Sequence, residues 1–268
     1  MMVLLRSIAA AFSFLTRLPV PASAIGDGDA AAVALGRSVV WFPLVGGLIG
    51  GAEVALARLL GGHLPPGLIA IALVALSAAL TGGLHLDGLA DTFDGWAGGR
   101  GERARTLEIM RDSRIGAHGA AALVLLLAAK IVAVFYLLPQ AELSGLWPLL
   151  AAPVLARWAV VPLVVFFGYA RAEGLGSAFQ AHARAVHVLG TTVVALGATI
   201  AIGMATPSFG DTATAMGIAA ASALGVALAL AALLDRRLGG LTGDVYGAAI
   251  ELAELVVLVS ATVTMASR

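Results

Sequence analysis

The chain has 268 residues, contains no cysteine, and balances 16 basic residues against 16 acidic ones, which gives a formal net charge of zero. This balance excludes the strongly basic surface typical of nucleic-acid-binding proteins, so we expect no nucleic-acid partner. The lack of cysteine excludes disulfides, a thiol nucleophile and zinc–thiolate sites. Apolar residues make up 60% of the chain and the mean hydropathy is +0.98, far above that of a soluble domain. We therefore predict a single integral membrane domain over residues 1–268.

The first 24 residues imitate a secretory signal peptide. Arg6 precedes an apolar stretch, and the small residues ASA at 22–24 resemble a cleavage site. Arg17 and two prolines interrupt the region before that site. We expect a retained short helix that lies on the membrane surface or enters it.

Apolar runs close to the ~20 residues that cross a bilayer recur along the rest of the chain. Turn-forming sequences such as GGHLPPG at 61–67 separate them. The sequence predicts an all-α fold, a polytopic membrane helix bundle of about seven transmembrane helices with an N-terminal interfacial helix. The expected spans are 38–60, 68–84, 117–138, 146–168, 188–205, 212–234 and 245–264.

The arginines are concentrated in alternate connections of this bundle. They lie before the first span, between the second and third, after the fourth and after the sixth. Because short cytoplasmic loops carry the excess of basic residues, these connections are predicted to face the cytoplasm. A site assembled from several loops on that one face is expected.

The connection 85–116 is rich in charge and contains Asp87, Asp91 and Asp94 in the sequence HLDGLADTFDG. Spacings of i, i+4 and i+7 place the three carboxylates on one face if the segment is helical. Like charges repel unless a cation binds them, and Mg²⁺ prefers such oxygen ligands. The alternative is a solvated loop whose acids pair with nearby arginines.

The sequence LEIMRDSRIGAHG at 107–119 follows. Arg111 and Arg114 have planar guanidinium groups that suit phosphate oxygens, and Asp112 could orient one of them or reach a metal. Carboxylates for a metal beside arginines for phosphate indicate phosphoryl-group chemistry. His85 could relay a proton, although a lone histidine at a helix end is more often structural.

Further charged residues lie near the last span. Asp244, Glu251 and Glu254 precede or enter it, and carboxylates inside a span usually face a bundle interior. The two glutamates either complete the site or pair with Lys130 or Arg157, whereas Asp244 is favoured as functional. Arg171 is a candidate phosphate ligand, with a surface arginine as the alternative.

Several of these segments together resemble the cobalamin synthase family. The resemblance runs from near the N-terminus to the last helix, and the HLDGLAD and MRDSR blocks are its most specific parts. The segments are FLTRLPVP (14–21), FPLVGGLIG (42–50), TGGLHLDGLADTFDG (81–95), LEIMRDSRIGAHG (107–119), EGLGSAF (173–179) and GGLTGDVYGAAIELAEL (239–255).

The resemblance implies an enzyme of the cell inner (cytoplasmic) membrane that joins adenosylcobinamide-GDP to α-ribazole, or to its 5′-phosphate, and releases GMP. It implies Mg²⁺ as cofactor, with Asp87, Asp91 and Asp94 as its ligands. The diphosphate would be bound by arginines of the 107–119 block, and a carboxylate such as Asp112 or Asp244, or else His85, would accept the hydroxyl proton. The partners would be these two substrates and the lipid bilayer, with a homo-oligomer possible.

Two alternative functions predict sequence patterns that differ from the one in this chain. A CDP-alcohol phosphotransferase would continue from Asp-Gly to an Ala-Arg pair, whereas this chain reads LADTFDGWAGG after Gly88. A transporter would concentrate ionisable residues at mid-membrane, whereas most of them here lie in the predicted cytoplasmic connections.

Overall fold

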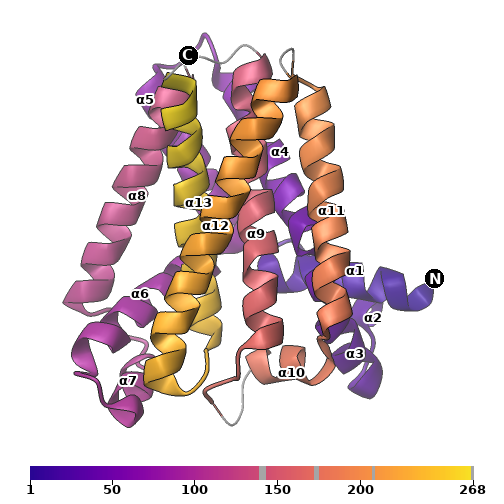
Figure 1. Ribbon diagram of the computed structural model, residues 1–268, viewed down its shortest axis with the longest axis vertical. Helices are drawn as coiled ribbons and strands as arrows, with labels where there is room; N and C mark the ends of the chain where they lie inside the picture. The colour runs from indigo at the N-terminus through magenta and orange to yellow at the C-terminus, as the bar shows by residue number, and fades with distance from the viewer. Residues whose placement is uncertain (139–142, 172–174, 207–208, 267–268) are drawn as a thin grey trace.

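The computed structural model describes residues 1–138, 143–171, 175–206 and 209–266, and within these ranges the chain is a bundle of helices without a β-strand (Figure 1). The helices are α1 (Met2–Leu15), α2 (Ala22–Ile25), α3 (Gly28–Ser38), η1 (Val39–Trp41), α4 (Phe42–Leu60), α5 (Pro66–Thr81), α6 (Leu84–Gly98), α7 (Arg103–Ile109), α8 (Ala117–Leu137), η3 (Leu143–Leu146), α9 (Trp147–Phe166), α10 (Leu175–His182), α11 (Ala185–Met204), α12 (Phe209–Leu238) and α13 (Gly243–Ala266).

The predicted membrane bundle is confirmed. In the described ranges, six helical stretches are long and apolar enough to cross a bilayer, and the bent pair α5–α6 makes seven if it counts as one span. The first stretch begins at Gly28 rather than at residue 38, because α3, η1 and α4 follow one another without a break. The expected short apolar helix at the N-terminus is α1.

Helix α9 is at the centre of the bundle, and α11 is at its periphery. Of the apolar window in α9, 72% is buried, against 17% in α11. α9 packs against α4, α11, α12 and α13, so it contacts most of the other long helices. The outer helices expose large apolar side chains such as Val124, Leu125 and Leu189, as helices facing lipid do.

A bend of 90° separates α5 from α6. Gly82 and Gly83 both have left-handed backbone angles, with φ of 63° and 72°, which glycine adopts at little cost. The expected second span therefore ends at Thr81, and the segment expected to begin a loop is the helix α6. Because α6 turns away from α5 and contains three aspartates, we regard it as lying outside the spanning segments.

The arginine-rich connections meet at one end of the bundle, where Figure 1 shows α6, α7 and α10 around the lower ends of the long helices. The guanidinium of Arg103 donates to the carbonyls of Leu238, at 2.6 Å, and Ala170, at 2.8 Å. The backbone N–H groups of Ala170 and Leu241 donate to Leu241 and Gly168, at 2.8 and 2.7 Å. The prediction that these connections share one side is confirmed for the described residues; residues 172–174 lie outside them.

Candidate active site

The candidate site forms where α6 crosses the beginning of α13, and two glycines allow the close approach. A Cβ atom on Gly88 would lie 2.7 Å from the carbonyl oxygen of Asp244, and one on Gly247 would lie 3.2 Å from the backbone of His85. Small residues at a helix crossing let the backbones pack directly. The crossing brings the aspartates of α6 beside Asp244, which is far away in the sequence.

Asp244 and Arg171, two of the predicted site residues, are in direct contact. Arg171 Nη2 donates to Asp244 Oδ2 at 2.7 Å and also to the carbonyl of Met110, at 3.2 Å. The Thr242 hydroxyl donates to the same carboxylate oxygen at 3.2 Å. Arg171 thus links the beginning of α13 to the turn that follows α7, and it positions Asp244 at the site.

Asp91 lies in a repulsive environment formed by other carboxylates. Burial, together with the charges of Asp244 and Asp87, raises its pKa to about 7, against an opposing effect of Arg171. Carboxylates that repel one another favour a bound cation, and oxygen donors are those that Mg²⁺ prefers. In its chemistry the set Asp87, Asp91 and Asp244 fits a divalent cation. Among the described residues, however, no three acidic or histidine side chains are already arranged around a metal position.

Asp94, the third aspartate of α6, contacts a different element. It is only 9% exposed, and its Oδ2 and Oδ1 accept hydrogen bonds from the backbone N–H groups of Gly116, at 2.7 Å, and Gly119, at 2.8 Å. These donors belong to the first turn of α8, which otherwise has no partner for them. Cβ atoms on either glycine would collide with the carboxylate. Asp94 therefore caps α8. The two glycines of the sequence GAHG at 116–119 could have indicated this role.

The turn after α7 contains Arg111, Asp112 and Arg114. The helix ends at Ile109, so Arg111 and Arg114 lie in a turn and not on a helical face. Arg114 is instead paired with Asp112, whose carboxylate accepts from Arg114 Nη2 at 2.6 Å and from Nε at 3.0 Å. These bonds hold the pKa of Asp112 down, at about 2. The side chain of Arg114 is 86% exposed and Arg111 is exposed as well, so both guanidinium groups are open to solvent.

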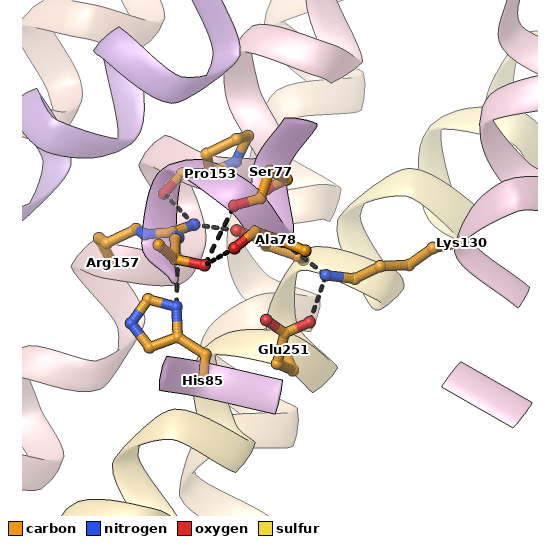
Figure 2. A network of polar contacts seen from close by, with 9 residues as sticks. Ser77, Ala78, His85, Lys130, Pro153, Arg157 and Glu251 are labelled. Atoms are coloured by element: carbon orange, nitrogen blue, oxygen red, sulfur yellow. Dashed lines mark hydrogen bonds and ion pairs between the residues drawn. The ribbon is translucent and has the colours of Figure 1, made fainter. Parts of the chain in front are cut away.

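A buried ionic network lies behind the site (Figure 2). Lys130 Nζ donates to Glu251 at 2.5 Å and to Glu254 at 2.6 Å, and Arg157 donates to Glu254. The alternative in which the glutamates pair with Lys130 or Arg157 is thus confirmed. The network joins α8, α9 and α13, and each buried charge has an opposite partner, as charges inside a membrane bundle require. Because these mid-bundle charges satisfy one another, they give no support to a transport pathway.

His85 connects this network to the site. It is 2% exposed, and its Nδ1 lies 3.4 Å from Arg157 Nη2, as Figure 2 shows. Because arginine can only donate, a neutral ring that accepts at Nδ1 has its proton on Nε2. His85 therefore presents an N–H donor to its other side, where Nε2 has no partner among the described residues.

A cavity of about 220 Å³ opens beside these residues. His85, Asp87, Arg171 and Asp244 line its polar end. Its apolar end is lined by aliphatic side chains of α9 and α13 and by three phenylalanines, Phe14, Phe42 and Phe179. A largely apolar pocket with a few convergent polar groups is the usual form of a small-molecule site. Sequence reasoning missed the phenylalanines, although each lies in one of the segments quoted above.

Comparison with known proteins gives consistent matches along the chain. The family model described as cobalamin-5-phosphate synthase matches residues 7–262. A protein of Pseudomonas aeruginosa named adenosylcobinamide-GDP ribazoletransferase is 46% identical over 263 residues, which cover 96% of this chain and 97% of that protein. Proteins of the same name from Klebsiella pneumoniae and Roseiflexus sp. are 41% and 40% identical, over 96% and 97% of this chain and 99% and 91% of theirs. No solved structure matches the chain.

Proposed function

This chain belongs to the cobalamin-5-phosphate synthase family, and from that premise we propose that it is a membrane transferase that joins adenosylcobinamide-GDP to α-ribazole or its 5′-phosphate, with release of GMP. The observation that carries the proposal is that Asp87, Asp244 and Arg171 line one cavity, with Asp91 close enough for the charges of Asp244 and Asp87 to raise its pKa. Acidic oxygens beside an arginine are the groups that phosphoryl transfer from a diphosphate requires.

In the proposed reaction, the 3′-hydroxyl oxygen of the ribose forms a bond to the phosphorus nearer the corrinoid. The anhydride bond between the two phosphorus atoms breaks, and GMP leaves with the electron pair. The hydroxyl proton passes to a carboxylate at the polar end of the cavity, with Asp244 as the first candidate because Arg171 and Thr242 fix its position. His85 is less suited to accept it, because its free nitrogen Nε2 is a donor.

We propose Mg²⁺ as the cofactor, held by Asp87 and Asp91 beside Asp244 rather than by all three aspartates of α6. Asp94 already uses both oxygens to cap α8, whereas the other three carboxylates repel one another. When bound, the ion would neutralise charge on the diphosphate during transfer.

The exposed turn after α7 is the proposed binding segment for the diphosphate. Arg111 and Arg114 are open to solvent there, and Asp112 holds the Arg114 guanidinium in a fixed orientation. Arg171 connects this turn to the carboxylates through the Met110 carbonyl. The diphosphate would therefore reach the cavity mouth from the side of this turn.

We also propose that this end of the bundle faces the cytoplasm at the cell inner membrane. The support is the gathering of arginines in the connections that form it.

The proposal is tested by incubating the purified protein with adenosylcobinamide-GDP, α-ribazole and magnesium. We expect GMP and a complete cobamide in equal amounts, and no product when either substrate is left out. Release of GMP without cobamide would indicate a hydrolase and would contradict the proposal.

A further inference from the structure

Two residues that line the cavity each have a buried side-chain nitrogen without a hydrogen-bond partner among the described residues: His85 Nε2 and Arg171 Nε. Both are donors, since the His85 proton is on Nε2 and an arginine nitrogen cannot accept. Tyr246 also lines the cavity, and its buried hydroxyl contacts Gln180. Leaving a buried donor unpaired is unfavourable. The cavity is thus built to receive hydrogen-bond acceptors.

The phenylalanines at the apolar end form a cluster of their own. The rings of Phe14 and Phe179 are 4.7 Å apart at an interplanar angle of 62°, and those of Phe42 and Phe179 are 6.0 Å apart at 77°. Phe14 and Phe42 are 6.3 Å apart and nearly parallel. Edge and face positions of this kind suit contact with another flat ring. The cluster comes from α1, α4 and α10, so three distant segments meet at it.

We propose that the apolar end of this cavity binds the planar base of the nucleoside acceptor, with its ribose at the polar end. The inference rests on the proposed function and adds which substrate occupies which part of the site. It places the ribose hydroxyls beside Asp87 and Asp244, where the reacting oxygen is needed. His85 and Arg171 then donate to acceptor atoms of the nucleoside.

The size of the cavity favours the nucleoside base over the other substrate. A cavity of about 150 Å³ accommodates benzene, so about 220 Å³ suits a fused pair of rings. A corrin macrocycle is several times larger and must stay outside, over the cavity mouth. The guanine base carries both donors and acceptors on its edges, and its donors would find no acceptor at the apolar end.

The chemistry of the lining also selects among bases. The benzimidazole of α-ribazole has apolar edges and a single free ring nitrogen, which only accepts. A purine with an exocyclic amino group would bury a donor among phenylalanines, where it has no acceptor. We expect the enzyme to bind α-ribazole at least tenfold more tightly than the corresponding adenine riboside.

The test fills the cavity without changing a polar group. Val164, in the last turn of α9, is buried and lines the cavity. In Val164→Phe, calorimetric titration with α-ribazole alone should show binding weakened at least tenfold, while KM for adenosylcobinamide-GDP changes by less than twofold. Thr199→Phe is the matched control, because Thr199 has the shape of valine and lines a separate apolar cavity between α9, α11 and α12. It should leave both values unchanged.

A second variant keeps the inference testable if Val164→Phe does not fold. Val164→Ala enlarges the cavity, and we expect it to accept a nucleoside with a three-ring base that the parent rejects. The inference is overturned if Val164→Phe raises KM for adenosylcobinamide-GDP instead, or if neither variant alters nucleoside selection. Cobamide formation by the parent protein is measured in parallel: if the parent forms product while these expectations fail, only the placement of the base is wrong. If the parent binds α-ribazole but forms no cobamide, the proposed function fails instead.

Discussion

Asp87, Asp91 and Asp94 lie on one helix but differ in what satisfies their charge. Backbone N–H groups of α8 bind Asp94, whereas Asp91 faces other carboxylates. A carboxylate that accepts hydrogen bonds from backbone N–H groups, as Asp94 does, stabilises the fold. A carboxylate that faces other carboxylates, as Asp91 does, lowers the stability of the fold. The same residue type therefore has a structural role at one position and a proposed catalytic role at the others.

This difference predicts opposite effects for the same substitution. Asp94→Asn replaces one acceptor oxygen by a donor and should lower the free energy of unfolding by about 1–2 kcal/mol. Asp87→Asn and Asp91→Asn should leave stability intact while turnover falls by orders of magnitude. Thermal unfolding in detergent and GMP release measure the two effects. Near-normal turnover in both Asp87→Asn and Asp91→Asn would remove these residues from the proposed cation site.

The raised pKa of Asp91 predicts how stability depends on pH when no cation is bound. Its value of about 7 is above the ordinary 3.8, so between these two values the folded protein keeps a proton that the unfolded chain has already lost. The unfolding temperature in chelator should therefore fall as pH rises from about 4 to about 7. The fall should be smaller in Asp91→Asn and in magnesium. An equal fall in Asp91→Asn would mean that another group titrates.

Arginine geometry gives a third prediction at this scale. Arg111→Lys and Arg114→Lys keep the positive charge but lose the planar pair of donors, so each should weaken use of adenosylcobinamide-GDP by more than about tenfold. The magnesium requirement should not change. Arg58→Lys, in the last turn of α4 beyond the site, is the control. If the lysine variants match the parent, the diphosphate is held elsewhere, with Arg171 as the next candidate.

At the scale of the elements, the crossing of α6 and α13 determines the site. Gly88 carries no side chain at the point where the helix backbones meet, and this contact places Asp87 and Asp91 beside Asp244. Amphipathic pattern alone could not have predicted it, because it joins segments more than a hundred residues apart.

We expect Gly88→Ala to separate these two helices. Its Cβ would lie 2.7 Å from the Asp244 carbonyl oxygen, so the backbones must shift, at a cost of about 1–3 kcal/mol. Turnover should fall at least tenfold, because catalytic groups tolerate little displacement. In the control Gly51→Ala, the new methyl group meets open space and both properties should be kept. If Gly88→Ala turns over as fast as the parent, the site tolerates a larger separation of α6 and α13.

The sequence allowed prediction of the elements better than of their contacts. Apolar runs predicted the spans, and charge inside a span suggested pairing of Glu251 and Glu254 with Lys130 or Arg157 as one of two alternatives, the one that the structure confirms. The helix α6 was missed as a separate element because its bend depends on the backbone angles of Gly82 and Gly83. The capping role of Asp94 and the phenylalanine cluster were missed for a related reason: each requires partners supplied by tertiary packing.

On the scale of the whole molecule, the arginine pattern predicts an orientation that labelling can test. The chain has no cysteine, so a single introduced cysteine reports one position. Ser113→Cys, in the exposed turn after α7, should react only when reagent reaches the cytoplasm. His63→Cys, in the exposed connection between α4 and α5, should react with an impermeant reagent from outside. The reverse result would contradict the orientation and, with it, a cytoplasmic active site.

The length of α12 has a consequence for where the chemistry takes place. Its 30 residues extend about 45 Å, whereas the hydrocarbon layer is about 30 Å thick. Asp235, Arg236 and Arg237 in its last turns cannot enter hydrocarbon cheaply, so this end projects into the headgroup layer. Arg103 ties the same end to the segment beside the site. Bond formation would thus occur at headgroup depth, where nucleotides arrive from water and a bulky product departs sideways along the membrane surface.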